Sequence, residues 1–210
     1  MRIVALIDQQ AKLSSILQNS LIKESHTFSI VECRKPVETV TDILLETPEV
    51  VLNLTTTTES IPTVAMLKDF RIPYTGSDAR VLLVTNNQNL TQQALLHEGL
   101  LVPKTIASDE CKIILAGPSM KMVAVEGKSD LPNSVLNDLT NKVCKLFELR
   151  DYAKIGIILE NGLPYVTKVQ SSFCLELNES FQAYLATHNH TYGSFLTYIL
   201  ESVCKRNMEF

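Results

Sequence analysis

The sequence predicts an α/β protein in which a doubly wound parallel sheet is followed by an α+β lobe. Through the first third of the chain, apolar β-branched runs alternate with segments of helical periodicity. This alternation is typical of parallel strands joined by right-handed crossovers. In the second half, the turn signals Gly117-Pro118 and Asn161-Gly162 each separate two short apolar segments. Such turns favour antiparallel hairpins.

Hydrophobic periodicity defines the elements of the first half. The apolar runs at residues 3–7, 27–31 and 50–54 are typical of buried parallel strands. A helix is expected after each strand; the second begins at Pro36, a residue favoured in a first turn, and the third covers about residues 62–70. The predicted apolar faces of the first two helices are Leu13, Ile16, Leu17 and Leu21, then Val37, Val40, Ile43 and Leu44.

The second half predicts two hairpins and two long helices. Residues 112–115 and 121–126 form the first hairpin, and the second turns at Asn161-Gly162. Between them lies a helix capped by Asn133 or Ser134, and the last helix covers residues 194–205. The predicted apolar stripes of these helices are Val135, Leu139, Val143, Leu146 and Phe147, then Phe195, Tyr198, Ile199 and Val203.

The composition narrows the function classes. The 210 residues carry a formal charge of −4, and no sequence cluster of Lys and Arg suggests a nucleic-acid partner. No apolar run approaches the roughly 18 residues that span a bilayer, so no membrane partner is expected. The five cysteines are odd in number and contain no C-x-x-C pair, which favours a reducing compartment. With residues 1–8 interpreted as a strand rather than a signal peptide, a cytoplasmic protein is expected.

One motif suggests an ancestry. The segment Phe70-Arg71-Ile72-Pro73-Tyr74-Thr75-Gly76-Ser77 and the later Gly99-Leu100-Leu101-Val102-Pro103 resemble the hinge region of D-alanine–D-alanine ligases and their ATP-grasp relatives. The resemblance implies two domains. Residues 1–86 would form a Rossmann-like pre-ATP-grasp domain, and residues 87–210 a truncated ATP-grasp-like domain. It also implies a homodimer through the N-terminal domain.

The loops after the parallel strands are the candidate ligand site, because ligands of doubly wound sheets bind at the carboxyl ends of the strands. In the ligases the loop after the third strand is rich in glycine, whereas here it contains four threonines, Thr55–Thr58. The resemblance implies that Glu59 matches the acidic residue that orients the amino group of the ligases' first substrate. Two interpretations stay open: a hydroxyl-rich loop in which Ser60 caps the next helix, and a small-ligand pocket. The candidate pocket residues are Glu59, Ser60, Tyr74, Thr75, Gly76 and Ser77.

Most of the ligases' nucleotide-binding lobe has no counterpart. Only the first hairpin stands in its place, and its Lys112, Lys121 and Lys128 have no Gly/Ser-rich loop beside them that would cover a triphosphate. Where the resemblance implies the nucleotide-binding lysine of the hinge, the chain has Gln88.

The metal-ligand positions implied by the resemblance are also changed. The ligases hold two Mg²⁺ ions with an Asp on one strand and a Glu and an Asn on the next. Here those positions are Gly156, Lys168 and Gln170. Magnesium requires hard oxygen ligands in near-octahedral geometry, so no metal, no cofactor and no catalytic residue is expected.

Two functions remain. The preferred one is a non-catalytic ligase-like pseudoenzyme that works by binding, with a second copy or another protein as its partner. The alternative is an ATP-grasp-type carboxylate-amine ligase, with ATP and Mg²⁺, or a binder of an amino acid or dipeptide at the edge of the N-terminal sheet. An enzyme of the first kind would be an ATP-dependent ligase.

Overall fold

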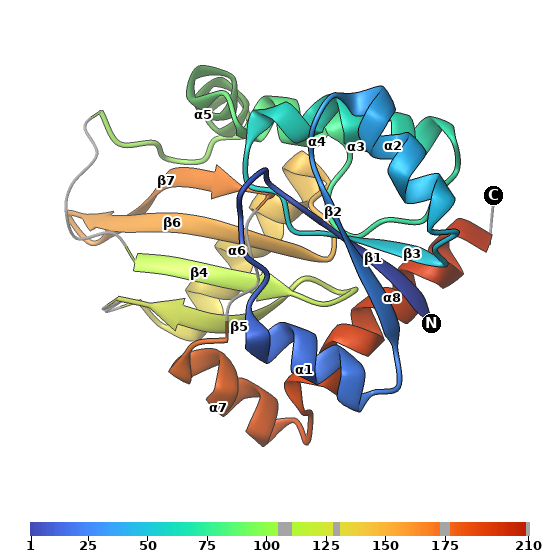
Figure 1. Ribbon diagram of the computed structural model, residues 1–210. Helices are drawn as coiled ribbons and strands as arrows, with labels where there is room; N and C mark the ends of the chain where they lie inside the picture. Colours follow the sequence, from blue (N-terminus) through green and yellow to red (C-terminus); the bar gives the residue numbers. More distant parts are fainter. Residues whose placement is uncertain (105–110, 128–130, 173–176, 209–210) are drawn as a thin grey trace.

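The computed structural model describes residues 1–104, 111–127, 131–172 and 177–208. It contains a parallel sheet, an antiparallel sheet and helices on the faces of both (Figure 1). Lys128 lies outside the described residues. No helix within those residues is long and apolar enough to cross a membrane.

The N-terminal sheet has three parallel strands in the order β2-β1-β3. They are β1 (Arg2–Ile7), β2 (Thr27–Glu32) and β3 (Val50–Asn53). A single parallel bridge between Val51 and Tyr74 extends the sheet beyond β3. The three expected strands and their parallel direction are confirmed.

Alternate residues of β1 enter two different cores, which is the physical basis of the doubly wound arrangement. Ile3, Ala5 and Ile7 belong to a cluster that includes α1 (Ser15–Lys23) and α8 (Tyr192–Met208). Val4 and Leu6 belong to a second cluster. That cluster includes residues of α2 (Pro36–Leu45) and α3 (Ile61–Asp69), and α3 directly follows the 3-10 turn η1 (Thr58–Ser60).

Two consecutive helices connect the sheets. They are α4 (Ala79–Thr85) and α5 (Gln88–His97). Asn86 is the C-terminal cap of α4, and Asn87 is the N-terminal cap of α5, so the predicted boundary between residues 86 and 87 lies in a tight turn between two helices.

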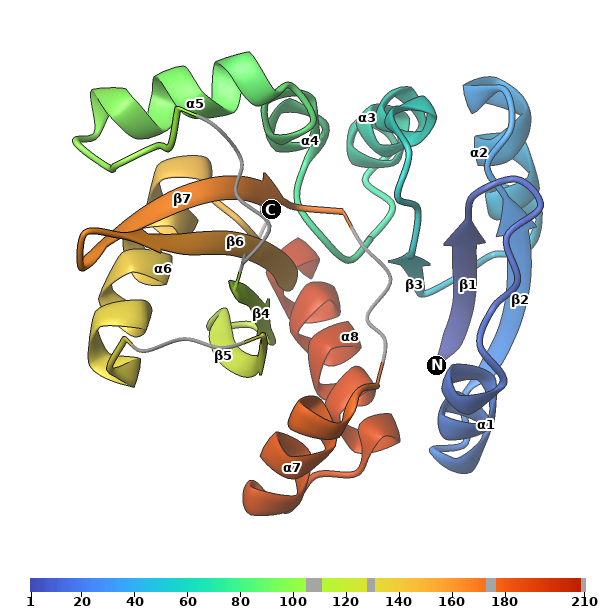
Figure 2. The same ribbon diagram turned by 90° about the vertical axis from the view of Figure 1, so that its left-hand side faces the viewer.

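The second sheet has four antiparallel strands in the order β5-β4-β6-β7 (Figure 2). They are β4 (Cys111–Ala116), β5 (Lys121–Glu126), β6 (Tyr152–Glu160) and β7 (Leu163–Gln170). The helix α6 (Asn133–Phe147) covers one face, and α7 (Glu179–Thr187) packs beside β5. A shift of register at Ile114/Leu115 explains why the sequence of β5 shows no regular alternation.

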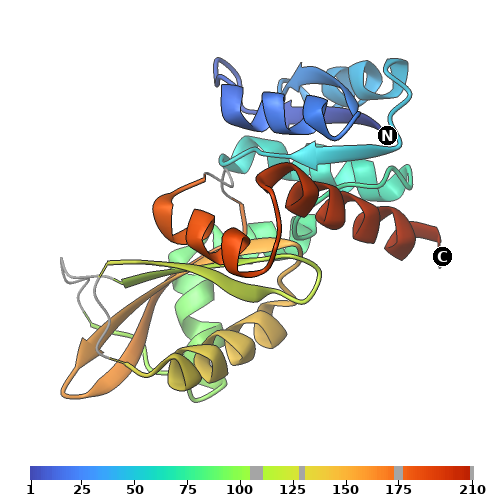
Figure 3. The ribbon, with the colours of Figure 1, turned by 90° about the horizontal axis from the view of Figure 1, so that it is seen from below.

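The two sheets share one core. Figure 3 shows α7 and α8 between the N-terminal and the antiparallel sheet. Phe195, Ile199 and Val203 of α8 belong to the same buried cluster as Leu52 of β3 and Ile114 of β4. The last helix therefore joins segments from both sides of the predicted domain boundary.

Several predicted helix faces are wrong in detail. Side chains expected in the apolar faces are exposed at Ile16 (53%), Val37 (66%), Leu44 (47%), Val135 (37%) and Tyr198 (49%). In α6, Leu136 is buried in place of Val135, and Pro132, not Asn133 or Ser134, occupies the N-cap position. The apolar residues on these helices exceed what one contact face accepts, and packing partners decide which of them are covered.

Candidate functional site

The loop after β3 is held by the carboxylate of Asp8, which follows β1. One oxygen of Asp8 accepts hydrogen bonds from the backbone nitrogen and the hydroxyl of Thr56, at 2.7 and 2.6 Å. The other accepts from the hydroxyl of Thr57 at 2.8 Å. Both loops lie at the carboxyl ends of neighbouring parallel strands, which is why residues 48 positions apart meet. The loop Thr55–Thr58, called the threonine loop below, thus directs three hydrogen-bond donors at one carboxylate.

Glu59 and Ser60, neighbours in the turn η1, point in different directions: one toward solvent and the other into the protein. The side chain of Glu59 is exposed, whereas Ser60 is completely buried. Ser60 occupies the N-cap position of α3, as predicted, but its hydroxyl donates to the carbonyl of Thr57 at 2.9 Å and makes no cap hydrogen bond. The predicted cap fails because η1 runs directly into α3, which leaves Ser60 in a helical conformation.

The segment from Tyr74 to Ser77 is built into the joint between the two sheets. The hydroxyl of Thr75, which is fully buried, accepts from the backbone nitrogen of Asn53 at 3.0 Å. It also lies 3.1 Å from the hydroxyl of Tyr152 in β6. Tyr152 in turn donates to the carbonyl of Asn53. Three hydrogen bonds therefore connect β3 and β6 with the segment Tyr74–Ser77, which is called the hinge below.

The next two residues of the hinge contact the turn before β6. The backbone nitrogen of Gly76 donates to the carboxylate of Asp151 at 2.8 Å, and the hydroxyl of Ser77 accepts from the nitrogen of Arg150 at 3.2 Å. Gly76 has φ +91°, and a Cβ atom there would lie 3.1 Å from the hydroxyl oxygen of Tyr152. Glycine is required here for both conformation and space.

One ionisable group, Tyr74, begins this segment, and another, Asp78, follows it. Burial, followed by the nearby carboxylate of Asp78, raises the pKa of Tyr74 to about 12, so Tyr74 is a neutral phenol at physiological pH. Burial also raises the pKa of Asp78, but the hydrogen bond from the Val81 nitrogen and the ammonium of Lys68 outweigh it. The pKa of Asp78 therefore lies below its ordinary value.

The positions that the resemblance associates with metal ions lie together on β6 and β7. Gly156 pairs directly with Lys168, and Gln170 pairs with Lys154. Gly156 has no side-chain donor, Lys168 carries an ammonium group, and Gln170 supplies one amide oxygen. This donor set does not fit a divalent cation. Gln88, at the position of the implied nucleotide lysine, is exposed on the first turn of α5.

The described residues also contain no cluster of side chains elsewhere that could bind a metal ion. In them, no three His, Cys, Asp or Glu side chains are grouped so as to hold an ion. The sequence did not predict that Lys154 and Lys168 lie on the same face of the sheet as Gly156. The alternation of side chains along a strand could have indicated it, since Lys154 lies two residues before Gly156, and Gln170 lies two residues after Lys168.

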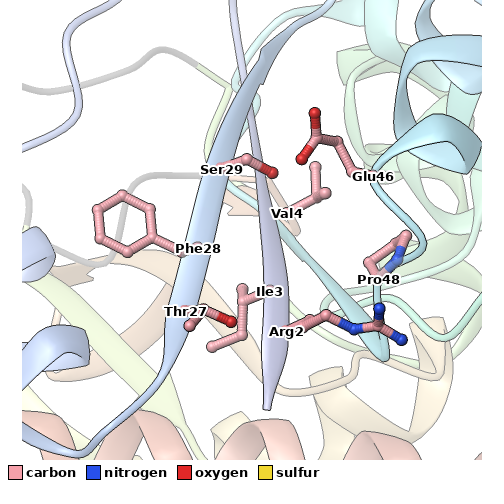
Figure 4. Close-up of a pocket in the computed structure, with 8 residues that line it drawn as sticks. All are labelled: Arg2, Ile3, Val4, Thr27, Phe28, Ser29, Glu46 and Pro48. Atoms are coloured by element: carbon pink, nitrogen blue, oxygen red, sulfur yellow. The ribbon is translucent and has the colours of Figure 1, made fainter.

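A cavity of about 140 Å³ lies at the opposite end of the parallel sheet (Figure 4). Its lining includes Arg2 and Thr27, the first residues of β1 and β2, together with Glu46 and Pro48. None of the candidate residues from Glu59 to Ser77 contributes to this cavity. The cavity and the predicted ligand edge are separate features of the sheet.

Comparison with known proteins identifies the fold. No model of a protein family matches the sequence, and no curated protein is significantly similar. Solved structures of D-alanine–D-alanine ligases do match. The Bacillus anthracis ligase complexed with ATP has a TM-score of 0.80 at 13% identity, covering 100% of this chain and 99% of that one. The Coxiella burnetii ligase has a TM-score of 0.71 at 12% identity, covering 100% and 95%.

A third ligase, from Aeromonas hydrophila, has a TM-score of 0.69 at 12% identity, covering 94% of this chain and 99% of that one. All three similarities extend over nearly the whole chain, including the parallel sheet, the hinge and the antiparallel sheet. At this identity they establish architecture rather than activity. The chain therefore has a truncated, ATP-grasp-like fold similar to that of the D-alanine–D-alanine ligases.

Proposed function

We propose that this chain is a non-catalytic, ligase-like protein that acts as a binding or interaction module. The observation that supports the proposal is the direct pairing of Gly156 with Lys168. Phosphoryl transfer depends on metal ions that neutralise the developing negative charge. An ammonium at this position repels a divalent cation, and the facing glycine supplies no compensating carboxylate.

The hinge supports the same proposal. Thr75 is hydrogen-bonded to Asn53 and Tyr152. Gly76 and Ser77 are hydrogen-bonded to Asp151 and Arg150, respectively. These contacts stabilise the joint between the sheets. The segment thus has a structural use that does not require a ligand, and the fold can persist without the chemistry.

The test combines thermal unfolding with an assay of phosphate release. We expect no shift in melting temperature with millimolar ATP that depends on Mg²⁺, and no phosphate release with D-alanine. A ligand at 100 times its Kd would add about 2.7 kcal/mol of stability, so binding would be readily detected. A shift with ATP and Mg²⁺ accompanied by D-alanyl-D-alanine formation would instead establish an ATP-grasp ligase and refute the proposal.

A second candidate function is the binding of a small carboxylate, such as an amino acid or dipeptide. The three donors that Thr56 and Thr57 direct at Asp8 favour it, because the same donors suit the carboxylate of a ligand. Glu59, exposed beside this loop, would receive the ligand's amino group. D-Alanine or D-alanyl-D-alanine should then raise the melting temperature, and more strongly in an Asp8→Ala variant, where the internal carboxylate is absent.

A second copy of the chain is the proposed partner, with the N-terminal domain as the interface. The edge strand β2 supports this: among the described residues it pairs with β1 alone, and it exposes Ile30 (44%). Beside it, Leu45 at the end of α2 is 76% exposed. A hollow of about 470 Å³ runs along this edge, lined by Ile30, Val31, Glu32, Arg34, Asp42, Leu45 and Glu46. Unprotected edge strands of this kind pair readily with another chain.

Light scattering coupled to gel filtration tests this interface. The wild type should run as a dimer and Ile30→Lys as a monomer of unchanged melting temperature. Leu163→Lys, a matched change at a side chain that is 51% exposed in the antiparallel sheet, should remain dimeric. A monomeric wild type, or equal dissociation of both variants, would rule this interface out.

A further inference from the structure

A row of charged residues crosses the antiparallel sheet. Glu126 of β5 lies opposite Lys112 of β4, Lys112 lies opposite Gly156 of β6, and Gly156 lies opposite Lys168 of β7. Residues directly opposite one another in a sheet project from the same face. The row therefore places one lysine on each side of a residue without a side chain, and it follows the strand order seen in Figure 2.

The neighbouring row adds a third lysine. Lys154 and Gln170 pair with each other and lie two residues from Gly156 and Lys168, so all four share one face. The backbones of β4 and β7 are about 10 Å apart, since each strand spacing is about 4.8 Å. Lysine side chains are long and flexible, so the ammonium groups of all three lysines can reach the space above Gly156.

Among the described residues, the side chains of these two rows carry more positive than negative charge. The carboxylate of Glu126 is 3.4 Å from the ammonium of Lys154 and accepts a hydrogen bond of 2.8 Å from the Asn178 side chain. In the part of the chain that the structure describes, neither Lys112 nor Lys168 has a carboxylate within 4.0 Å. Both are exposed, whereas the side chain of Lys154 retains only 23% of its accessible surface. Among the described residues paired across these strands, one carboxylate thus faces three ammonium groups.

We propose that this face binds a small, multiply charged oxyanion of the phosphate or pyrophosphate class directly, without a divalent cation. Lys112, Lys154 and Lys168 surround the anion above Gly156, and the amide of Gln170 donates a further hydrogen bond. The bare backbone at Gly156 leaves room for the anion to approach the sheet. Lys154 lies on one side of the site, paired with Glu126, whose other carboxylate oxygen accepts from Asn178. The inference rests on the proposed non-catalytic function and specifies its ligand class.

Calorimetric titration with inorganic pyrophosphate in excess EDTA tests the site on the whole chain. The wild type should bind, and Lys112→Gln/Lys168→Gln should bind at least about tenfold more weakly, given the modest contribution of each exposed charge pair. The matched control is Lys142→Gln/Lys145→Gln on α6, which removes the same charge at exposed positions across the sheet. Its affinity should stay within about twofold of the wild type. Lys168→Arg, which keeps the charge, should bind like the wild type.

Added salt and a monovalent anion complete the test. Affinity for pyrophosphate should fall steeply between low and physiological salt, and acetate should not compete. No binding by the wild type, or equal weakening by the control and the test variant, would overturn the site while leaving the non-catalytic proposal intact. Metal-dependent ATP turnover, absent in EDTA, would instead overturn the non-catalytic proposal. All variants should keep the melting temperature of the wild type, because the exchanged lysines are exposed.

Discussion

Arg206, near the end of α8, holds the carboxylate of Asp151 through two hydrogen bonds of 3.0 Å each. Asp151 is 1% exposed and also accepts the hydrogen bond from the Gly76 nitrogen. Three segments distant in sequence therefore meet at one carboxylate: the hinge, the turn before β6 and the last helix. This contact stabilises the arrangement of the two sheets.

Removing the guanidinium should be costly. Arg206→Leu would leave the buried carboxylate of Asp151 without its charged partner, and we expect unfolding to require roughly 2–3 kcal/mol less free energy, since broken buried pairs cost several kcal/mol. The side chain of Arg206 is 31% exposed, so the loss of stability should be smaller than for a completely buried ion pair. Urea denaturation measures the loss. Lys205→Leu, an adjacent exposed position, should change stability by less than about 0.5 kcal/mol; equal losses would contradict the assignment.

Gly76 provides a test of steric fit. Gly76→Ala should lower the unfolding free energy by about 2–3 kcal/mol, because it adds a disfavoured positive φ to a contact of 3.1 Å with Tyr152. Gly99→Ala is the matched control: φ is +71°, but nothing lies within 4 Å of the new Cβ. It should cost about 1 kcal/mol. In a Tyr152→Phe background the cost of Gly76→Ala should decrease, whereas strict additivity would show that the hydroxyl is not the obstacle.

The cap of α4 should make stability depend on pH. Asp78 accepts from the Val81 nitrogen at 3.1 Å and from Lys68 at 3.2 Å, and its pKa is lowered in the folded state. Its contribution is therefore complete above the ordinary carboxyl pKa and is lost as the pH falls through the lowered one. Asp78→Ala should cost about 1–2 kcal/mol at pH 7, and this cost should shrink in acid.

Asn87 is the neutral counterpart of Asp78. It caps α5 by accepting from the Leu90 nitrogen at 3.1 Å. Asn87→Ala should cost about 1 kcal/mol, independent of pH. Urea denaturation between pH 3 and pH 7 compares the two variants. A cost for Asp78→Ala that stays constant over this range would show that the charge of the cap contributes nothing.

The threonine loop should depend on Asp8. Asp8→Ala removes three hydrogen bonds to Thr56 and Thr57, and we expect faster amide hydrogen exchange at Thr56 with a loss of about 1–2 kcal/mol in unfolding free energy. Asp42→Ala, which breaks the exposed pair with Arg34, is the control. It should cost at most about 1 kcal/mol and leave the exchange of Thr56 unchanged. Unaltered exchange in Asp8→Ala would contradict the role of the carboxylate.

Local patterns predicted most of the secondary structure. The hairpins at Gly117 and Asn161-Gly162 depend on turn residues, and the parallel strands depend on continuous apolar runs. Helices α4, α5 and α7 were not identified from the residue pattern. Only Thr91 and Leu95 of α5, and Phe181 and Leu185 of α7, are buried, so each apolar stripe is too narrow to stand out from sequence alone.

The candidate site was predicted only in part. The sequence located the loops at the carboxyl edge, yet not that Asp8 accepts the donors of Thr56 and Thr57. It also located the hinge at Gly76 without revealing that Asp151 and Tyr152 engage it. Ligand binding by Glu59, Ser60 and the hinge remains a prediction.

By itself, the sequence determined the order of the strands and of the helices that it predicted, and it showed that Gly156 and Lys168 carry no side-chain oxygen, because periodicity, turn chemistry and residue type are local properties. The tertiary structure alone decided that Lys112 and Lys168 flank Gly156 and that Arg206 reaches Asp151. Strand register and helix docking depend on how side chains from both sheets pack against one another, and a local sequence pattern carries no information about these distant partners.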